Sequence, residues 1–466
     1  MEQDDFFSEE TYKKAREFEK QMESGESFFY DTDELEEIIE FYIETQELNK
    51  AWAAISYGMS LYPYENYYFI KQAEVLLNKK ESRQAIKLLE ECQLREPNNV
   101  EISKLLGDGY NLLMQYKRAI DHYLIAFKAR FEVDEVLLQL LRLNFILNRP
   151  EKAVSFLIAS PENPYIADTI IPEVVKLLID FQQIEHAIPY LRTVIDDFPY
   201  NYTAWYFMGY CFQKMEEYEN GIDAFEYCIA IDEHNSMGHL GKGNCLMELA
   251  KHEEAIEEYN LALDNDSTDA EVYCNIAECY EHLNNLNTAK YFYLKALKID
   301  KNLSDAYYGL GLIYKRQERY REAEKNILKA IDQDPYECLY HIELAELYLL
   351  MDKKERCFHH YDKAIEIDGK TIEILLDYAQ ALVHFEETQH AVTLLLKAIK
   401  DGLADYRFFY RASSYLFHIG EYESAYNYLH EALQLSPNNY MLLYEYAPFT
   451  ENNETVTNII DLYLLK

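Results

Sequence analysis

The octet YDKAIEID at residues 361–368 repeats, with few changes, the octets YLKALKID at 293–300 and YNLALDND at 259–266. Each begins with a tyrosine and has alanine three places later, a spacing that puts both on one face of a helix. Four residues before each tyrosine stands a small residue that recurs at one constant interval along the chain. Its twelve positions are Ala51, Ala85, Ala119, Ala153, Ala187, Gly221, Ala255, Ala289, Ala323, Cys357, Ala391 and Ala425. The chain is therefore predicted to be a repeat protein of twelve units.

One unit, SDAYYGLGLIYKRQERYREAEKNILKAIDQDP at 304–335, shows what each repeat forms. Its first half carries a helical stripe of Tyr307, Leu310, Gly311 and Tyr314. Its second half carries another stripe, of Tyr320, Ala323, Ile327 and Ala330. Pro335 stands where the second helix must end. Two amphipathic helices joined at KRQER are predicted, and a lone pair could not bury both stripes.

Two helices per unit, small residues at the eighth and twentieth places and a closing proline resemble the tetratricopeptide repeat, whose unit is about 34 residues long. The resemblance covers residues 32–437 without an insertion. It implies an all-α, right-handed superhelical solenoid, elongated and curved, of about twelve units with neighbour-only contacts.

The chain departs from the family pattern at several places. Trp205 is the one tryptophan at the fourth place of a unit, and Leu141 and Val175 replace the small residue of the eighth place. The segment SPENPYIAD at 160–168 would cut the second helix of the fourth unit short. Irregular stacking is expected around the fourth and fifth units.

Both flanks are expected to close the array. Residues 1–31 are predicted to form an N-terminal capping helix, centred on 8–24. Residues 438–466 resemble an incomplete thirteenth unit that would cap the other end. Solenoids need such caps, because their end repeats would otherwise expose an apolar face.

Composition limits the possible functions. Among 466 residues, 83 are acidic and 44 basic, a formal charge of −39, so a nucleic-acid backbone would be repelled along most of the surface. The N-terminal MEQDDFFSEETYKK has acids where a secretory signal needs bases, and no window approaches 18 uninterrupted apolar residues. A cytoplasmic protein without membrane insertion is expected, its 8 cysteines being packing residues of a reducing compartment.

A search for catalytic or cofactor motifs returns little. The sequence holds no GxxxxGK[ST], GxGxxG, GxSxG or HExxH. The nearest approach to a metal signature is CLYH at 338–341 followed by CFHH at 357–360, but Cys357 stands at a place that alanine fills in most units. Cys211, Cys245 and Cys279 recur at the repeat interval and form a column, which packing also explains. No metal, no cofactor and no enzymatic activity are expected.

In the tetratricopeptide family the first helices line a groove, and the second, fifth, sixth, ninth, twelfth and thirteenth places commonly meet the ligand. Carried onto this chain, those places give an acidic patch of Asp33, Glu36, Glu37, Glu40 and Glu44. They also give a middle zone of Arg142, Lys176, Tyr206, Phe207, Tyr210, Asn244, Asn275 and Tyr308. The resemblance implies that the middle zone binds a peptide, with asparagines holding its main chain.

A third zone has Arg407 and Arg411 on one helix face, similar to the basic pair of the carboxylate-clamp modules that bind chaperone C-termini. The other clamp places hold Ile342, Glu346 and Asp377, so no chaperone clamp is expected.

The expected function is a non-enzymatic scaffold that binds a protein or peptide segment of unknown identity. Two alternatives stay open: a regulatory subunit of an enzyme complex, and a structural protein that associates with itself.

Overall fold

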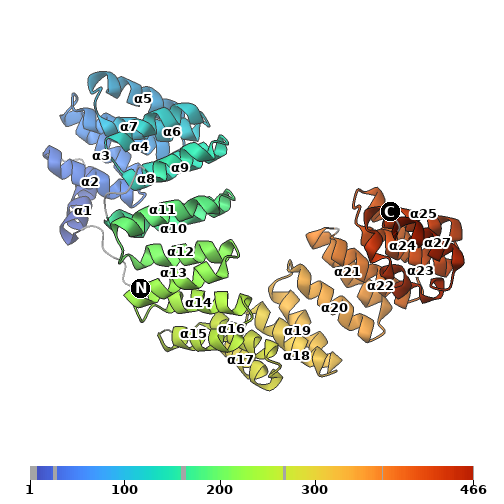
Figure 1. Cartoon of the computed structure of the whole chain (residues 1–466). Coiled ribbons are helices and arrows are strands. Elements are labelled where there is room, and N and C mark those ends of the chain that lie inside the picture. The colour runs from blue at the N-terminus through green and yellow to red at the C-terminus, as the bar shows by residue number, and fades with distance from the viewer. Residues whose placement is uncertain (1–7, 25–28, 159–163, 266–268, 370, 465–466) are drawn as a thin grey trace. The chain divides into compact units, whose positions relative to one another are not determined.

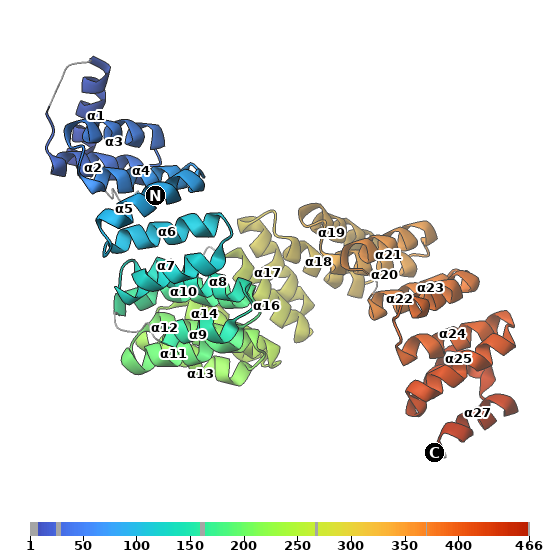
Figure 2. The same ribbon diagram turned by 90° about the horizontal axis from the view of Figure 1, so that it is seen from above.

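The computed structural model describes residues 8–24, 29–158, 164–265, 269–369 and 371–464, and these form helices joined by short turns, with no strand among them. The all-α repeat fold expected from the recurring pattern is thereby confirmed. The chain falls into two compact units, residues 1–233 and 234–466, which are described separately. Within each unit, consecutive helices lie against one another (Figures 1 and 2).

The first unit contains α1 (Glu9–Ser24), α2 (Thr32–Glu44), α3 (Leu48–Leu61), α4 (Asn66–Asn78), α5 (Ser82–Arg95), α6 (Val100–Leu112), α7 (Tyr116–Lys128), α8 (Val133–Ile146), α9 (Pro150–Ile158), α10 (Pro164–Asp180), the 3₁₀ turn η1 (Ile184–His186), α11 (Ala187–Asp197), α12 (Tyr202–Lys214) and α13 (Tyr218–Ile231).

The second unit contains α14 (Ser236–Glu248), α15 (His252–Asn265), α16 (Ala270–His282), α17 (Leu286–Ile299), α18 (Ser304–Arg316), α19 (Tyr320–Gln333), α20 (Cys338–Leu350), α21 (Lys354–Asp368), α22 (Ile372–His384), α23 (Thr388–Lys400), α24 (Tyr406–Ile419), α25 (Tyr422–Leu435), η2 (Pro437–Asn439), α26 (Met441–Tyr446), η3 (Pro448–Thr450) and α27 (Glu454–Leu464).

The first helix of many repeats begins at a side-chain cap placed immediately before the unit. At these caps a side-chain oxygen accepts a hydrogen bond from a backbone N–H of the first turn, which satisfies a donor that has no partner inside the helix. The capping residues are Asp31, Asn99, Asn201, Asn235, Asp269, Glu337, Thr371 and Asp405. The cap therefore marks the start of these eight first helices, whereas α4, α8 and α18 begin without a side-chain cap.

The turn between the two helices of each repeat contains one residue in the left-handed conformation, always at the same place of the unit. Its occupants are Gln46, Lys80, Met114, Asn148, Gln182, Glu216, Ala250, Asn284, Glu318, Asp352, Glu386 and Gly420. Only the last is glycine, although a side chain strains this conformation and glycine does not. The backbone geometry of the turn is therefore imposed by the two helices that it joins.

Relieving this strain should stabilise the array. Glycine in place of Lys80, Glu216, Ala250 and Glu318 is expected to raise the free energy of unfolding by about 0.5–1 kcal/mol per site, since strain relief outweighs the extra chain entropy of glycine. The urea midpoint measures the effect. Ala250→Val is the opposed control, because a β-branched residue fits the left-handed region poorly, and a stabilised Ala250→Val would contradict the explanation.

Side-chain sizes at the eighth place of the first helix and the twenty-fourth place of the unit are complementary. Where the later residue is aromatic, the earlier is glycine or alanine, as in Gly107 with Tyr123, Gly209 with Phe225, Gly243 with Tyr259, Ala277 with Tyr293 and Ala345 with Tyr361. A Cβ added to Gly209 would lie 2.9 Å from the Phe225 ring. The small residue thus makes room for a buried ring.

The same rule accounts for the two departures seen in the sequence. Leu141 and Val175 occupy the eighth place of units whose twenty-fourth residues are Leu157 and Leu191, and all four side chains are buried. In these two repeats the eighth residue is larger than the glycine or alanine of the others, and the twenty-fourth is a leucine instead of an aromatic ring. The core of each therefore stays filled.

The fourth and fifth repeats nevertheless differ from the others in their helices. α9 has 9 residues, whereas α10 has 17 and contains Pro172. Residues 159–163, which include the start of the segment SPENPYIAD, lie outside the described residues, and α10 begins at Pro164.

The terminal helices cover apolar surface within their own units. Ala15 and Phe18 of α1 are buried against α2 and α3. At the other end, Val456 and Ile460 of α27 join the core formed by α24 and α25. The division into a cap at 1–31, twelve repeats at 32–437 and a cap at 438–466 stays a prediction.

Candidate functional site

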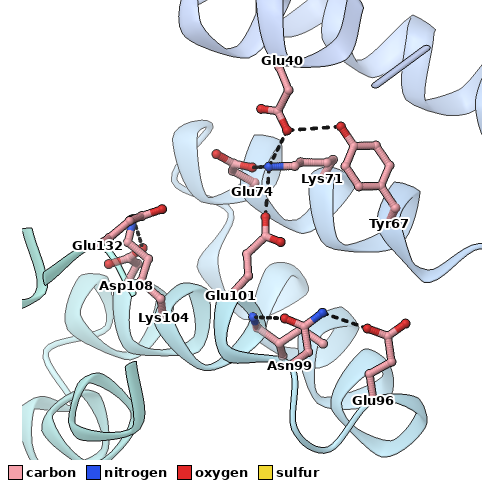
Figure 3. A network of polar contacts seen from close by, with 11 residues as sticks. Glu40, Tyr67, Lys71, Glu74, Glu96, Asn99, Glu101, Lys104, Asp108 and Glu132 are labelled. Carbon is pink, nitrogen blue, oxygen red and sulfur yellow. Dashed lines mark hydrogen bonds and ion pairs between the residues drawn. The ribbon is translucent and has the colours of Figure 1, made fainter. Parts of the chain in front are cut away.

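A row of charged side chains runs along α2, α4 and α6, which are the first helices of three successive repeats in the first compact unit (Figure 3). Lys71 on α4 lies at its centre, with its Nζ 2.8 Å from a Glu40 carboxylate oxygen on α2, 3.0 Å from Glu74 on α4 and 3.0 Å from Glu101 on α6. The Lys71 side chain is only 9% exposed. Glu40 also accepts a hydrogen bond of 3.2 Å from the Tyr67 hydroxyl. This Lys71 clasp ties three successive first helices together.

A second clasp of the same kind is centred on α6. Lys104 on that helix lies 3.3 Å from Asp108, 3.0 Å from Glu132 and 3.1 Å from Glu135. Asp108 further accepts a hydrogen bond of 2.6 Å from the Tyr123 hydroxyl. Each of these two clasps combines one ammonium group with three carboxylates, so the row keeps a surplus of negative charge.

Burial and neighbouring charges shift the pKa values of these groups. Burial alone would lower the pKa of Lys71, but the surrounding carboxylates, first Glu74, raise it well above its usual value. Burial raises the pKa of Glu74 and of Asp108, although each is paired with a lysine. The carboxylates are therefore held in place at a desolvation cost that the lysines offset only in part.

The structure assigns different surroundings to the five residues of the predicted acidic patch. Asp33 and Glu44 are exposed. Glu37 accepts a hydrogen bond of 2.5 Å from the Thr11 hydroxyl and forms an ion pair of 2.6 Å with Lys14, and both partners lie on α1. Glu40 belongs to the Lys71 clasp. Burial, followed by Asp33 and Glu40, raises the pKa of Glu36. Two of the five carboxylates are thus engaged within the protein.

The middle zone divides between the two compact units. In the first unit, Arg142 on α8 and Lys176 on α10 are exposed, and neither forms an ion pair with any residue that the structure describes. Both cationic groups therefore remain available to an anionic group of a partner.

Three of the four aromatic residues of the middle zone, Tyr206, Phe207 and Tyr210, form one cluster on α12. The Tyr206 ring centroid lies 5.1 Å from that of Phe207 and 6.5 Å from that of Tyr210. Phe207 and Tyr210 also pack against the core, and Tyr206 lies 5.8 Å from the buried Phe225. The cluster is half-buried, so these side chains combine a packing role with a partly accessible surface.

In the second unit, Asn244 on α14 and Asn275 on α16 contact one another. The Asn244 Oδ1 accepts a hydrogen bond of 2.8 Å from the Tyr259 hydroxyl and one of 3.3 Å from the Asn275 Nδ2. Among the described residues, nothing pairs with the Asn244 Nδ2 or the Asn275 Oδ1. One donor group and one acceptor on neighbouring first helices thus remain for a ligand.

Tyr308 on α18 lies against Tyr340, with ring centroids 5.0 Å apart. Burial, followed by Glu343 and Glu346, raises its pKa. The same two carboxylates each lie 2.7 Å from the Lys315 Nζ. Tyr308 therefore lies in the field of a charged group of which only Glu346 was named from the sequence.

A cavity of about 210 Å³ opens beside this group. Its walls are Lys315, Glu346, Leu349, Leu350, Tyr361, Asp377 and Gln380. Burial raises the pKa of Asp377, and the neighbouring Glu346 raises it further. Residues from α18, α20, α21 and α22 meet here, and the spacing of inward places could have indicated Lys315, Glu346 and Gln380.

The cysteine and histidine pattern at 338–360 forms hydrogen bonds of its own. The Nδ1 atoms of His341 and His360 lie 2.9 Å apart and share a hydrogen bond, and the Cys338 Sγ lies 3.5 Å from the Ala364 carbonyl oxygen. Burial lowers the pKa of both imidazoles, that of His360 to about 4, so both are neutral at pH 7. Within the described ranges, no group of three or more His, Cys, Asp or Glu could hold a metal ion.

The cysteine column consists of buried side chains. Burial raises the pKa of Cys211, Cys245 and Cys279 to about 12 in each case. These thiols stay protonated at neutral pH and are poor nucleophiles.

The basic pair on α24 is engaged within the protein. The Arg407 Nε lies 2.9 Å from Asp405, and one of its terminal nitrogens lies 3.2 Å from Glu373. Arg411 is 8% exposed, donates a hydrogen bond of 2.7 Å to the Leu376 carbonyl oxygen and stacks on Tyr446. Neither guanidinium is arranged to meet a carboxylate ligand.

None of the described helices is both long and apolar enough to cross a membrane.

Comparison with known proteins identifies the repeat. Two family models described as tetratricopeptide repeat match the chain, one at residues 292–325 and the other at 202–235, 239–269, 270–303 and 406–439. No curated protein sequence matches it.

Several solved structures are similar. One chain of the APC/C hetero-tetramer Cut9–Hcn1 is 13% identical to this chain, and the match covers 98% of this chain and 94% of that chain with a TM-score of 0.40. A tetratricopeptide repeat protein from Parabacteroides merdae is 18% identical over 51% of this chain and 93% of that chain, with a TM-score of 0.42. YrrB, described as a TPR protein with an unusual peptide-binding site, is 16% identical over 40% of this chain and 97% of that chain, with a TM-score of 0.32.

Proposed function

The chain belongs to the tetratricopeptide repeat family, and from this premise we propose that it is a non-enzymatic scaffold that binds an extended protein segment along its first helices. The observation that carries the proposal is the asparagine pair of the second unit. Asn244 offers amide N–H donors and Asn275 a carbonyl acceptor. A peptide group presents the complementary acceptor and donor, so the pair can hold a main chain whatever its side chains are.

The charged groups around the pair would then select among segments. Tyr308 and the cavity beside Lys315 lie on the following helices of the same unit, with Glu346 and Asp377 in its wall. In the first unit, Arg142, Lys176 and the aromatic cluster of Tyr206, Phe207 and Tyr210 offer a second contact region of the opposite charge. Aromatic side chains commonly supply much of the affinity at such interfaces.

The experiment begins with affinity capture of the partner from its native source, mass spectrometry to identify it, and a titration of the purified pair. Asn244→Asp keeps the oxygen that accepts from Tyr259 but removes the amide donors, so it leaves the core hydrogen bond intact. Combined with Asn275→Ala, it should weaken binding at least about tenfold, the loss expected for two hydrogen bonds of a buried peptide group.

Asn260→Asp is the matched control, since Asn260 is an exposed asparagine on the second helix α15 and gains the same charge. Its affinity should equal that of the parent. Equal affinity of the Asn244→Asp, Asn275→Ala variant would place the binding site elsewhere. A molar mass that rises with concentration in light scattering, without any partner, would instead support a self-associating protein.

A further inference from the structure

A second cavity lies away from the inward places, between the second helices α11 and α13, with α12 as its floor. Its volume is about 380 Å³, in the range of small-ligand pockets. Its walls are Arg192, Ile195 and Asp196 of α11, Trp205, Met208 and Phe212 of α12, and Asn220, Asp223, Ala224 and Tyr227 of α13. The cavity thus combines an aromatic wall with two carboxylates.

The aromatic wall is fixed by two contacts. The Trp205 Nε1 donates a hydrogen bond of 2.9 Å to the Pro199 carbonyl oxygen. The indole stacks on the Tyr227 ring, with centroids 4.4 Å apart and an interplanar angle of 24°. Tyr227 itself is 57% exposed. A rigid, accessible aromatic surface results.

The equivalent place in other repeats shows what such a ring binds. Tyr273 and Tyr307 occupy the fourth place of their units, as Trp205 does, and each is covered by a lysine from the same place of its own second helix. The Nζ of Lys295 lies 4.1 Å from the Tyr273 centroid, and that of Lys329 lies 4.7 Å from the Tyr307 centroid. Arg95, from a later place of its helix, covers Phe69 at 4.9 Å. These three repeats supply a cation to the ring from their own chain.

In the Trp205 repeat the place of that lysine is taken by Tyr227, a neutral residue. No cation of the described chain lies over the Trp205 ring, although tryptophan is the aromatic side chain that attracts cations most strongly. Asp196 and Asp223, both exposed, have no hydrogen-bond or ion-pair partner within the ranges that the structure describes. The site is therefore complementary to positive charge.

We propose that this cavity binds an arginine side chain of a partner protein. A guanidinium group is planar and can stack on an aromatic wall, while its N–H donors reach two carboxylates at once. Arg192 lines the same cavity and repels an incoming cation, so it tunes the affinity. This site is independent of the asparagine pair, and either can fail without the other.

The test uses the full chain carrying Trp52→Phe, which leaves Trp205 as the single tryptophan. Titration with acetyl-arginine methylamide should change the Trp205 fluorescence in a saturable way. The acetyl-citrulline analogue has the same shape without the charge, and it should bind at least about tenfold more weakly. Equal responses to the two compounds, or no saturable response, would overturn the proposal. A tighter response to acetyl-lysine methylamide would assign the cavity to an ammonium group instead of a guanidinium.

Two variants locate the site. Asp196→Asn with Asp223→Asn should weaken binding at least about tenfold, whereas Glu219→Gln, an exposed acid on the same helix α13 that does not line the cavity, should leave it unchanged. Tyr227→Lys should block the site, because it places the chain's own cation over the ring, as in the Tyr273 and Tyr307 repeats. Unchanged binding in either variant would refute the assignment. Arg192→Gln should strengthen binding of acetyl-arginine methylamide, because it removes a like charge from the cavity wall, and weaker binding in that variant would contradict the proposed charge complementarity.

Discussion

Replacing Gly209 by valine is expected to lower the free energy of unfolding by about 3 kcal/mol, at the upper end of the range for overpacked cores. A single Cβ at this position would already lie 2.9 Å from three carbons of the Phe225 ring, and Phe225 is completely buried. The better helix propensity of valine returns only about 0.4 kcal/mol. Chemical unfolding followed by circular dichroism measures the difference.

A second substitution distinguishes overpacking from other causes. Phe225→Leu in the Gly209→Val background should recover about half of the lost stability, although Phe225→Leu alone destabilises the protein by roughly 1–2 kcal/mol. The neighbouring repeat already combines Val175 with Leu191 at these two places. Additive losses in the double variant would contradict the proposed size complementarity.

Replacing Lys71 by methionine is expected to cost roughly 1–3 kcal/mol at neutral pH, because it leaves three half-buried carboxylates without their counter-charge and hydrogen-bond donor. Glu40, Glu74 and Glu101 all lie within 3.0 Å of the Lys71 Nζ. Lys87→Met, at an exposed position on α5, is the control and should change stability by less than about 0.5 kcal/mol.

The loss in Lys71→Met should shrink as the pH falls from 7 to 5. Burial already raises the pKa of Glu74 in the folded protein, and removal of the ammonium group raises it further. When the pKa of a group is higher in the folded than in the unfolded state, the folded protein takes up its proton first as the pH falls. The free energy of unfolding therefore rises until the pH reaches the pKa of the unfolded state. Unfolding curves at both pH values measure this, and a loss that is equal or larger at pH 5 would show that the clasp acts by packing alone.

The position and type of the helices could be predicted from the sequence because their signals are local. Apolar residues three and four places apart lie on one helix face whatever surrounds them, and recurrence at a constant interval exposes the repeat. The left-handed turn residues gave no such signal, since Gln46, Met114 and Glu318 share no chemistry. Their conformation follows from the helices on either side.

For the candidate site, the family resemblance supplied the places but not the partners. Asn244 and Asn275 were assigned to inward places of the middle zone, and the structure adds that they hydrogen-bond to each other. The half-burial of the aromatic cluster on α12 depends on how it packs against the core, and the sequence could not assign it.

By itself, the sequence determined that this chain is an all-α repeat protein, because helix-forming patterns and repeat phase are properties of residues close together along the chain. The tertiary structure alone decided which charges are engaged. Glu40, Lys71 and Glu101 come from the first helices of three successive repeats and meet only when those helices stack. It likewise decided that Arg411 is buried while Asp196 and Asp223 are accessible beside Trp205. Burial and pairing depend on distances between repeats, and those distances exist only in the packed chain.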